Sequence, residues 1–175
     1  MILSTLDPET LAEHADAVVA RLEDSYENVR YWALVILRML EPATLAQHAD
    51  AVVARLEDSA LVVRFYALEM LGELEPATLA QHANAVVASL DDNDSEMCEI
   101  REAALKTLAK LEPATLAKHA YKVLGMLEDE DDNVHEAALI TLANLEPATL
   151  AQHADALVED LKDEEGQVYE AAMYT

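Results

Sequence analysis

The five prolines of this chain fall in one recurring phrase, and their spacing is the strongest constraint on its fold. Each proline follows an acidic residue and precedes Ala-Thr-Leu-Ala, or Glu-Thr-Leu-Ala in the first case. They are Pro8, Pro42, Pro76, Pro113 and Pro147, at successive intervals of 34, 34, 37 and 34 residues. A fixed period of this length indicates a repeat array, in which each unit buries its apolar surface against its neighbours.

Each repeat is expected to form two antiparallel helices, A and B, because its apolar residues recur at helical spacing. In the first repeat, helix A is expected to bury Leu11, Ala15, Val18, Val19 and Leu22. The buried stripe of helix B recurs in four repeats as Val29, Ala33, Leu37 and Leu40; Val63, Ala67, Leu71 and Leu74; Ile100, Ala104, Leu108 and Leu111; and Val134, Ala138, Leu142 and Leu145.

Helix A has two candidate starts. Thr10 and Glu13 fit a capping box, in which the two side chains satisfy free backbone donors, and Thr44 with Gln47 repeats the pattern. Pro8 favours an earlier start, since proline is preferred at the first helical position. Both starts fit the sequence.

We therefore predict an all-α fold, a right-handed α-solenoid of about five stacked antiparallel helix pairs forming one domain. The predicted repeats span residues 6–39, 40–73, 74–110, 111–144 and 145–175, and residues 1–5 align with the end of a preceding helix B. Neither end carries the polar capping repeat that such arrays need. We expect either a piece of a longer array or an array that self-associates through its uncapped ends.

The acidic charge balance narrows the choice of partner. The chain has 35 acidic and 11 basic residues, a formal net charge of −24. Such a surface repels nucleic-acid phosphates and anionic membranes, so neither is expected, whereas basic proteins or peptides are attracted. The alternative is that the charge only keeps the array soluble. The single cysteine, Cys98, gives no sign of an oxidising compartment, so a cytoplasmic location is expected.

Helix B and the turn before it carry a motif, Leu-x-Asp, a polar turn, then Val-Arg-x-x-Ala-x-x-x-Leu. Its most informative positions are Asp24 with Arg30 and Asp58 with Arg64 in the first two repeats, and Arg101 in the third. With this motif the chain resembles the HEAT-repeat family. The resemblance implies that these Asp and Arg side chains bond between neighbouring repeats. In the fourth and fifth repeats, His135 and Tyr169 stand in the place of the Arg.

The period is shorter than the roughly 40–47 residues of HEAT repeats and equals the 34 of tetratricopeptide repeats. That family needs small side chains where its two helices touch and an aromatic residue early in helix A. Aligned on the proline, this chain has Val18 and Arg30 at the small positions and His14 at the aromatic one. The residues therefore favour the HEAT-like interpretation.

Five histidines recur at one position of helix A: His14, His48, His82, His119 and His153. A metal ladder is not expected, because stacked helices lie about 8–10 Å apart, whereas zinc needs nitrogen ligands near 2.0–2.1 Å. Inter-repeat polar contacts are expected instead, either from a histidine to its neighbour's flank at Asp16, Asp50, Asn84, Tyr121 or Asp155, or from Arg21 or Arg55 to an acid. Since no catalytic or cofactor-binding motif is present, we expect no cofactor and no enzymatic activity.

Aromatic residues on the outward side of helix B break the repeat pattern. We predict a binding surface formed by Tyr31, Trp32, Val35, Phe65, Tyr66 and Glu69. Aromatic side chains at such positions are enriched among the residues that dominate binding. The alternative is that they fill the inner curve of the solenoid or shield its uncapped end.

Three functional hypotheses follow. The first is a non-catalytic scaffold that binds a basic protein or peptide. The second is a structural spacer or self-associating segment. The third rests on the resemblance alone, since HEAT-like repeats also occur in phycobilin lyases and metal hydroxylases.

Overall fold

The computed structural model describes residues 8–91 and 98–153, and the regular structure of these residues is entirely helical. Its contacts divide the chain into two compact units, Met1–Ala85 and Val86–Thr175. The division falls within one helix, α7 (Pro76–Ala88).

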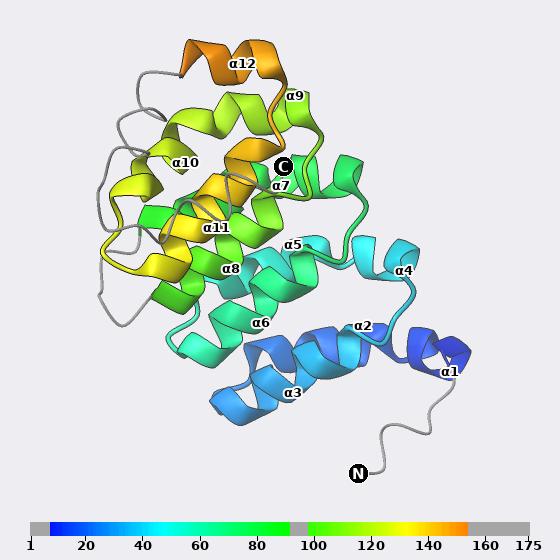
Figure 1. Cartoon of the computed structure of the whole chain (residues 1–175). Coiled ribbons are helices and arrows are strands. Elements are labelled where there is room, and N and C mark those ends of the chain that lie inside the picture. Colours follow the sequence, from blue (N-terminus) through cyan, green and yellow to red (C-terminus); the bar gives the residue numbers. More distant parts are fainter. Residues whose placement is uncertain (1–7, 92–97, 154–175) are drawn as a thin grey trace. The chain divides into compact units, whose positions relative to one another are not determined.

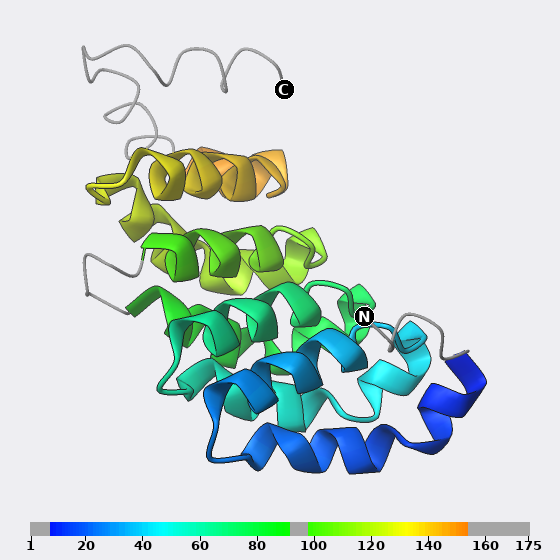
Figure 2. The same cartoon turned by 90° about the horizontal axis from the view of Figure 1, so that it is seen from below.

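The first unit contains two complete repeats of the same construction, and α7 begins the third. In each repeat, a short proline-led helix is followed by a second short helix, a 3₁₀ turn and a longer helix B (Figure 1). The longer helices α3 and α6 lie side by side (Figure 2). The elements are α1 (Pro8–Glu13), α2 (Ala15–Val19), η2 (Ala20–Glu23), α3 (Glu27–Leu37), α4 (Pro42–Ala46), α5 (Ala49–Val53), η3 (Ala54–Glu57) and α6 (Leu61–Leu71).

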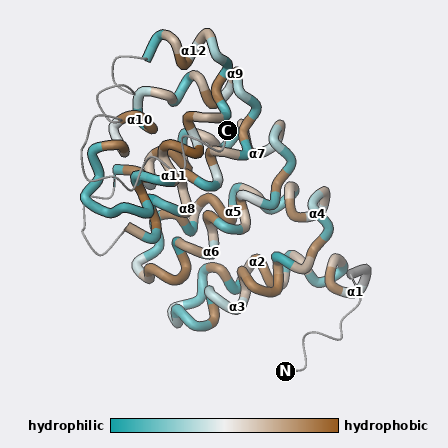
Figure 3. The backbone as a smooth tube through the Cα atoms, in the orientation of Figure 1, coloured by the Kyte–Doolittle hydropathy of each residue, from teal (hydrophilic) through white to brown (hydrophobic). Residues whose placement is uncertain are grey.

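The second unit repeats this construction. Its helices α8 and α11 are neighbours in the way that α3 and α6 are in the first unit. The turn between η7 and α11 is hydrophilic (Figure 3), as its run of acidic residues predicts. The elements are η4 (Ser89–Asp91), α8 (Cys98–Leu108), α9 (Pro113–Leu116), η6 (Ala117–His119), α10 (Ala120–Gly125), η7 (Met126–Glu128), α11 (Asp132–Ala143) and α12 (Pro147–Gln152).

Helix A begins at its proline, so the earlier of the two candidate starts is correct. In the second repeat the carbonyl of Glu41 accepts hydrogen bonds from the amides of Thr44 and Leu45, both at 2.9 Å. Thr44 therefore lies inside the helix and does not cap it, and no side chain caps this end. The capping-box prediction is wrong here, because proline has already started the helix two residues earlier.

Helix A is also not one continuous helix, contrary to expectation. The backbone leaves helical geometry at His14, His48 and His119, with φ between −106° and −113° and ψ between 2° and 10°. In the third repeat, α7 runs through His82 without a break, and nothing in its residues explains the difference. A repeat with this break has three helical segments instead of two.

The core matches the predicted stripe of helix B almost completely. Ala33, Leu37, Leu40 and every member of the stripe in the next three repeats are buried. Val19 and its equivalent in the second repeat, Val53, are both half-buried. Val18 and Val29 of the first repeat are also only half-buried, whereas their equivalents Val52 and Val63 are 1% and 0% exposed. The second repeat has a described neighbour on that side and the first does not, which accounts for the difference.

Several predictions concern residues outside the described ranges. These are the helix remnant at 1–5, the three-residue insertion within 91–98, and helix B of the fifth repeat with Tyr169. The predicted handedness and the total of five helix pairs stay predictions for this reason. Among the helices described, none is both long and apolar enough to cross a lipid bilayer.

Candidate interaction surface and inter-repeat contacts

Four aromatic rings from α3 and α6 form one cluster in the first unit, which we call the aromatic cluster: Tyr31, Trp32, Phe65 and Tyr66. Tyr31 joins the two helices, with its ring centroid 4.8 Å from that of Tyr66 in an edge-to-face arrangement. Trp32 and Phe65 extend the cluster at either side, 5.1 Å from Tyr31 and 5.6 Å from Tyr66. Edge-to-face and tilted rings at these distances attract one another.

The cluster is partly covered and partly open. Trp32 is 55% exposed, while the other three rings are half-buried. Val35 and Glu69, which were predicted to belong to the same surface, lie one helical turn further along α3 and α6 and are also half-buried. The rings thus pack on each other, as expected if they fill space within the solenoid. They still leave surface available to a partner, because Trp32 is exposed.

At the helix B positions of the aromatic cluster, the sequence has aromatic residues only in the first two repeats. At the places of Phe65 and Tyr66, the third repeat has Glu102 and Ala103, and Ala103 is 3% exposed. Glu102 pairs with Lys106 on its own helix, 2.5 Å away. These positions of the second unit therefore present a charged ridge and no aromatic surface.

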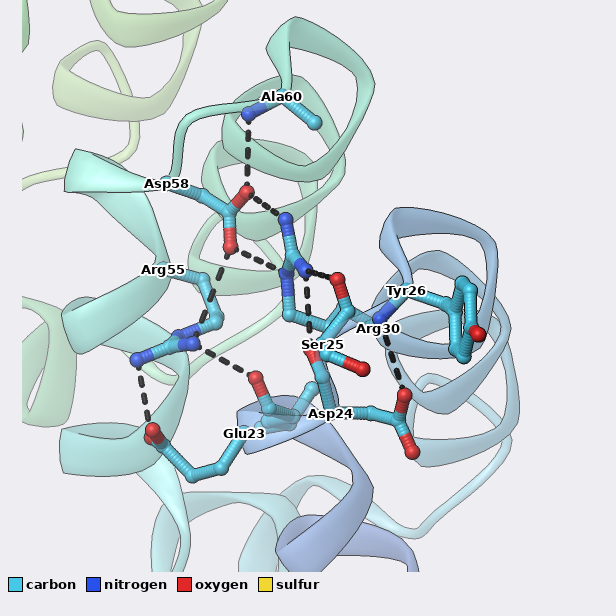
Figure 4. Close-up of polar contacts among 9 residues, drawn as sticks. Glu23, Asp24, Ser25, Tyr26, Arg30, Arg55, Asp58 and Ala60 are labelled. Carbon is cyan, nitrogen blue, oxygen red and sulfur yellow. Dashed lines mark hydrogen bonds and ion pairs between the residues drawn. The ribbon is translucent and has the colours of Figure 1, made fainter.

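A buried ion pair joins the first two repeats. Arg30 donates from Nε and Nη2 to the two carboxylate oxygens of Asp58 at 2.7 and 2.6 Å (Figure 4). The remaining nitrogen of Arg30 donates to the carbonyl of Asp24 at 2.9 Å, and the amide of Ala60 donates to Asp58 at 2.9 Å. The contact lies between neighbouring repeats, as the resemblance implied for these two residues.

The ion pair shifts the pKa values of both residues. Burial alone would raise the pKa of Asp58, but hydrogen bonds from Arg30 and the Ala60 amide, with the charges of Arg30 and Arg55, outweigh it. The pKa of Asp58 therefore lies below its usual value. The hydrogen bond to Asp58 raises the pKa of Arg30 in turn.

The second unit repeats the arrangement with Arg101 and Asp129, whose atoms lie 2.6 and 3.0 Å apart. The amide of Asp131 donates to Asp129 at 3.0 Å, as that of Ala60 does to Asp58. In the first repeat, Asp24 accepts a bond from the amide of Tyr26 at 3.0 Å. Arg64, which was predicted to belong to the same series, is half-buried on α6.

Two of the five recurring histidines lie beside an acid of the preceding repeat. His48 Nδ1 is 4.0 Å from Asp16, and His82 Nδ1 is 3.8 Å from Asp50. His14 is exposed, whereas His119 and His153 are half-buried. Burial, with the charge of Lys118, lowers the pKa of His119.

The described residues contain no group of three or more His, Cys, Asp or Glu side chains that could hold a metal ion. The absence of a metal site elsewhere in the chain stays a prediction.

Arg55 also joins the first two repeats, on the helix A side. Its Nη1 donates to the carbonyl of Leu22 at 2.6 Å and its Nη2 to Glu23 at 2.9 Å, both in the preceding repeat (Figure 4). An acid was the predicted partner, but the carbonyl was not foreseen. That carbonyl is free because it lies in the last turn of helix A, where intrahelical donors run out.

The sequence analysis also missed a groove. It is an open cavity of about 470 Å³ between α2 and α3, lined mainly by apolar side chains, among them Trp32. The sequence carried no signal for it, because Val18 and Val29, which line the groove, were expected to be buried. Trp32 therefore belongs to two surfaces, the aromatic cluster and this groove.

Comparisons with known proteins bear on the fold. No protein-family model matches the sequence, and no curated protein matches it. Among solved structures, a designed armadillo repeat protein in complex with the peptide (KR)4 is similar with a TM-score of 0.72 and 17% identity. The match covers 98% of this chain and 86% of that one.

The structure of the complex of CpcE and CpcF of phycocyanin lyase from Nostoc sp. PCC7120 is similar with a TM-score of 0.66 and 17% identity. It covers 92% of this chain and 96% of that one. An engineered protein matches with a TM-score of 0.71 and 19% identity, over 98% of this chain and 91% of its own. These likenesses confirm the predicted fold class: the chain is an all-α solenoid of helical repeats.

Proposed function

We propose that this protein is a non-catalytic helical-repeat scaffold that binds a basic protein or peptide segment through the aromatic cluster and Glu69. The observation that carries the proposal is the cluster itself. Four rings from two neighbouring repeats meet within 4.8–5.6 Å on one surface, and one of them, Trp32, is 55% exposed.

The chemistry of this surface suits Lys and Arg side chains. Aromatic faces attract cations, and their apolar area accepts the aliphatic stems of basic residues. Glu69 adds a carboxylate beside the rings, and the net charge of −24 would steer a basic segment toward the protein. The similar designed protein is itself in complex with the peptide (KR)4. That complex supports the choice of ligand class, although it is a fact about the other protein.

The test is the binding of a fluorescently labelled (KR)4 peptide to the full chain, measured by anisotropy. Replacing both Tyr31 and Phe65 by Ala is expected to weaken binding at least about tenfold, since aromatic hot spots contribute 2 kcal/mol or more. The helical circular dichroism of the double variant should stay unchanged. Unchanged affinity in a folded double variant would defeat the proposed site.

Matched controls are available in the same chain. Tyr26 and Tyr121 are 73% and 83% exposed and lie outside the aromatic cluster. Replacing both by Ala removes the same kind of side chain and should leave the affinity unchanged. An octaglutamate peptide should fail to bind, and the affinity for (KR)4 should fall as salt is raised.

Within the helical-repeat class, we propose that the chain is an array of repeats similar to HEAT and armadillo repeats. The Arg–Asp contacts between repeats support the HEAT-like interpretation. The break of helix A at His14, His48 and His119 gives three helical segments in a repeat, which supports an armadillo-like variant.

The absence of catalysis is also part of the proposal. Burial, with the neighbouring Asp131, raises the pKa of the Cys98 thiol, which makes it a poor nucleophile at neutral pH. A phycobilin or metal that stays with the purified protein would contradict this part. The proposed location is cytoplasmic, because the single cysteine gives no sign of an oxidising compartment.

The structural-spacer hypothesis remains a second candidate, and the open groove beside Trp32 is the observation that favours it. Light scattering over a concentration series separates the two. A mass that rises with concentration supports self-association, and a constant monomer mass argues against it.

A further inference from the structure

The groove between α2 and α3 has the same kinds of residues as the surface with which the second repeat contacts the first. Val18, Val29 and Ile36 line it, with His14 and Arg21 among its polar residues. One repeat later, the corresponding residues are Val52, Val63 and Met70, with His48 and Arg55. Those three apolar side chains are 1%, 0% and 1% exposed, because the first repeat covers them.

The polar contacts of that covered interface define the chemistry of what covers it. His48 lies 4.0 Å from Asp16, near the start of α2. Arg55 meets the carboxylate of Glu23 at 2.9 Å and the carbonyl of Leu22 at 2.6 Å, at the end of the same helix A. The covering element is therefore a helix pair that presents an apolar ridge, one acid near the middle of its helix A and a second acid where helix A ends.

The first repeat has the residues that correspond to His48 and Arg55, namely His14 and Arg21. His14 is exposed, and the Arg21 side chain is 69% exposed, held only by a 4.0 Å contact with Asp24 of its own turn. Trp32 stands in the place of Tyr66, which packs on Tyr31 of the repeat before it. The side chains of the groove thus correspond in position and type to those with which the second repeat contacts the first.

From this correspondence we infer that the groove docks a helix pair that places one acid opposite His14 and another acid opposite Arg21. Charge complementarity favours such a partner over another copy of this chain. In the sequence, the fifth repeat carries Lys162 at the place of Glu23, which would bring a like charge to Arg21.

The experiment supplies a helix pair of the stated chemistry to the full chain. A copy of residues 6–39, with its tryptophan changed to Tyr, is joined ahead of residue 6, so that Trp32 remains the only tryptophan. We expect Trp32 emission to shift to the blue and its quenching by acrylamide to fall roughly threefold, as an exposed indole becomes covered. Circular dichroism verifies that the extended chain is folded.

A charge reversal tests the acid opposite Arg21. Changing Glu23→Lys within the added copy should return the quenching of Trp32 toward that of the unextended chain. A further Arg21→Glu change in the resident repeat should restore the protection. Equal protection by the original and reversed copies, or no protection by either, would overturn the inference.

The unextended chain tests the second copy as occupant. Its Trp32 emission should not change with protein concentration. A blue shift that grows with concentration would show that copies of this chain fill the groove, and would overturn the choice of partner. Neither measurement uses the (KR)4 peptide, so the outcome is independent of the proposed peptide site.

Discussion

At the scale of single residues, Arg30 and Asp58 form a buried ion pair between the first two repeats. Their side chains are 10% and 3% exposed, and two hydrogen bonds join them. Removing one member of such a buried pair is costly, because the other is left charged and out of water.

Changing Asp58→Asn is expected to lower the free energy of unfolding by about 3 kcal/mol. Urea denaturation followed by circular dichroism measures the change. Glu57→Gln, at the exposed neighbouring position, is the control and should change stability by less than about 0.5 kcal/mol.

The same pair predicts a pH dependence. The folded pKa of Asp58 is lowered from an ordinary value of 3.8, so its contribution is fully present above pH 3.8. It is lost as the pH falls through the lower folded pKa. The difference in stability between the wild-type chain and Asp58→Asn should therefore be constant near neutrality and shrink on acidification below pH 3.8. A difference that grows on acidification would contradict this assignment.

For single residues, the sequence indicated the kind of contact that a side chain makes better than it indicated how exposed the side chain is. The resemblance implied that these Asp and Arg side chains bond between neighbouring repeats, as Arg30 and Asp58 do, but it did not name the individual pairs. It did not distinguish Trp32 from Tyr66, which occupy the same repeat position. One is 55% exposed and the other half-buried, because only Tyr66 has a described neighbour on that side.

Among the helices, α11 begins in a way that α3 and α6 do not. The side chain of Asp131 accepts bonds from the amides of Asn133 and Val134, at 3.0 and 3.3 Å. Tyr26 and Ala60 stand at the same place before α3 and α6 and give no side-chain cap. The start of α11 thus depends on a bond that the other two helices lack.

Changing Asp131→Ala should lower the free energy of unfolding by about 1 kcal/mol, since an N-cap bond is lost. Asp131→Asn keeps an acceptor oxygen and should retain most of the stability, and Glu130→Gln is the exposed control. Thermal denaturation measures the three variants. Equal losses from Asp131→Ala and Asp131→Asn would show that charge, not the cap, matters at this position.

The helical period predicted the two helices A and B of each described repeat, but not the break at His14, His48 and His119. Helical spacing is almost unchanged when one residue leaves helical geometry, so the apolar pattern carries no trace of the break. The prolines were a better guide to the starts of helices than the Thr-x-x-Glu/Gln phrase.

For the whole molecule, the repeat is the unit of stability. Each repeat contacts its neighbours, so an array tolerates the loss of one complete unit better than the loss of half of one. Because the period is 34 residues, deleting 34 consecutive residues removes one complete repeat.

Deleting residues 40–73 should leave a folded chain with the same helical ellipticity per residue and a lower melting temperature, because one interface is lost. Deleting residues 57–73 removes α6 and leaves the preceding helix without its partner, so it should lower the ellipticity per residue. Circular dichroism with thermal melting compares the two. Similar behaviour of both deletions would contradict a modular array.

The sequence alone determined the repeat period, the pairing of helices, the buried stripe of helix B and the acidic surface. These follow from the spacing and type of residues along the chain, which fix what each segment must bury. Only the tertiary structure decided which equivalent positions are covered, where helix A breaks and that an open groove lies beside Trp32. Coverage depends on whether a neighbour packs on a given face, and identical repeat positions carry no record of that.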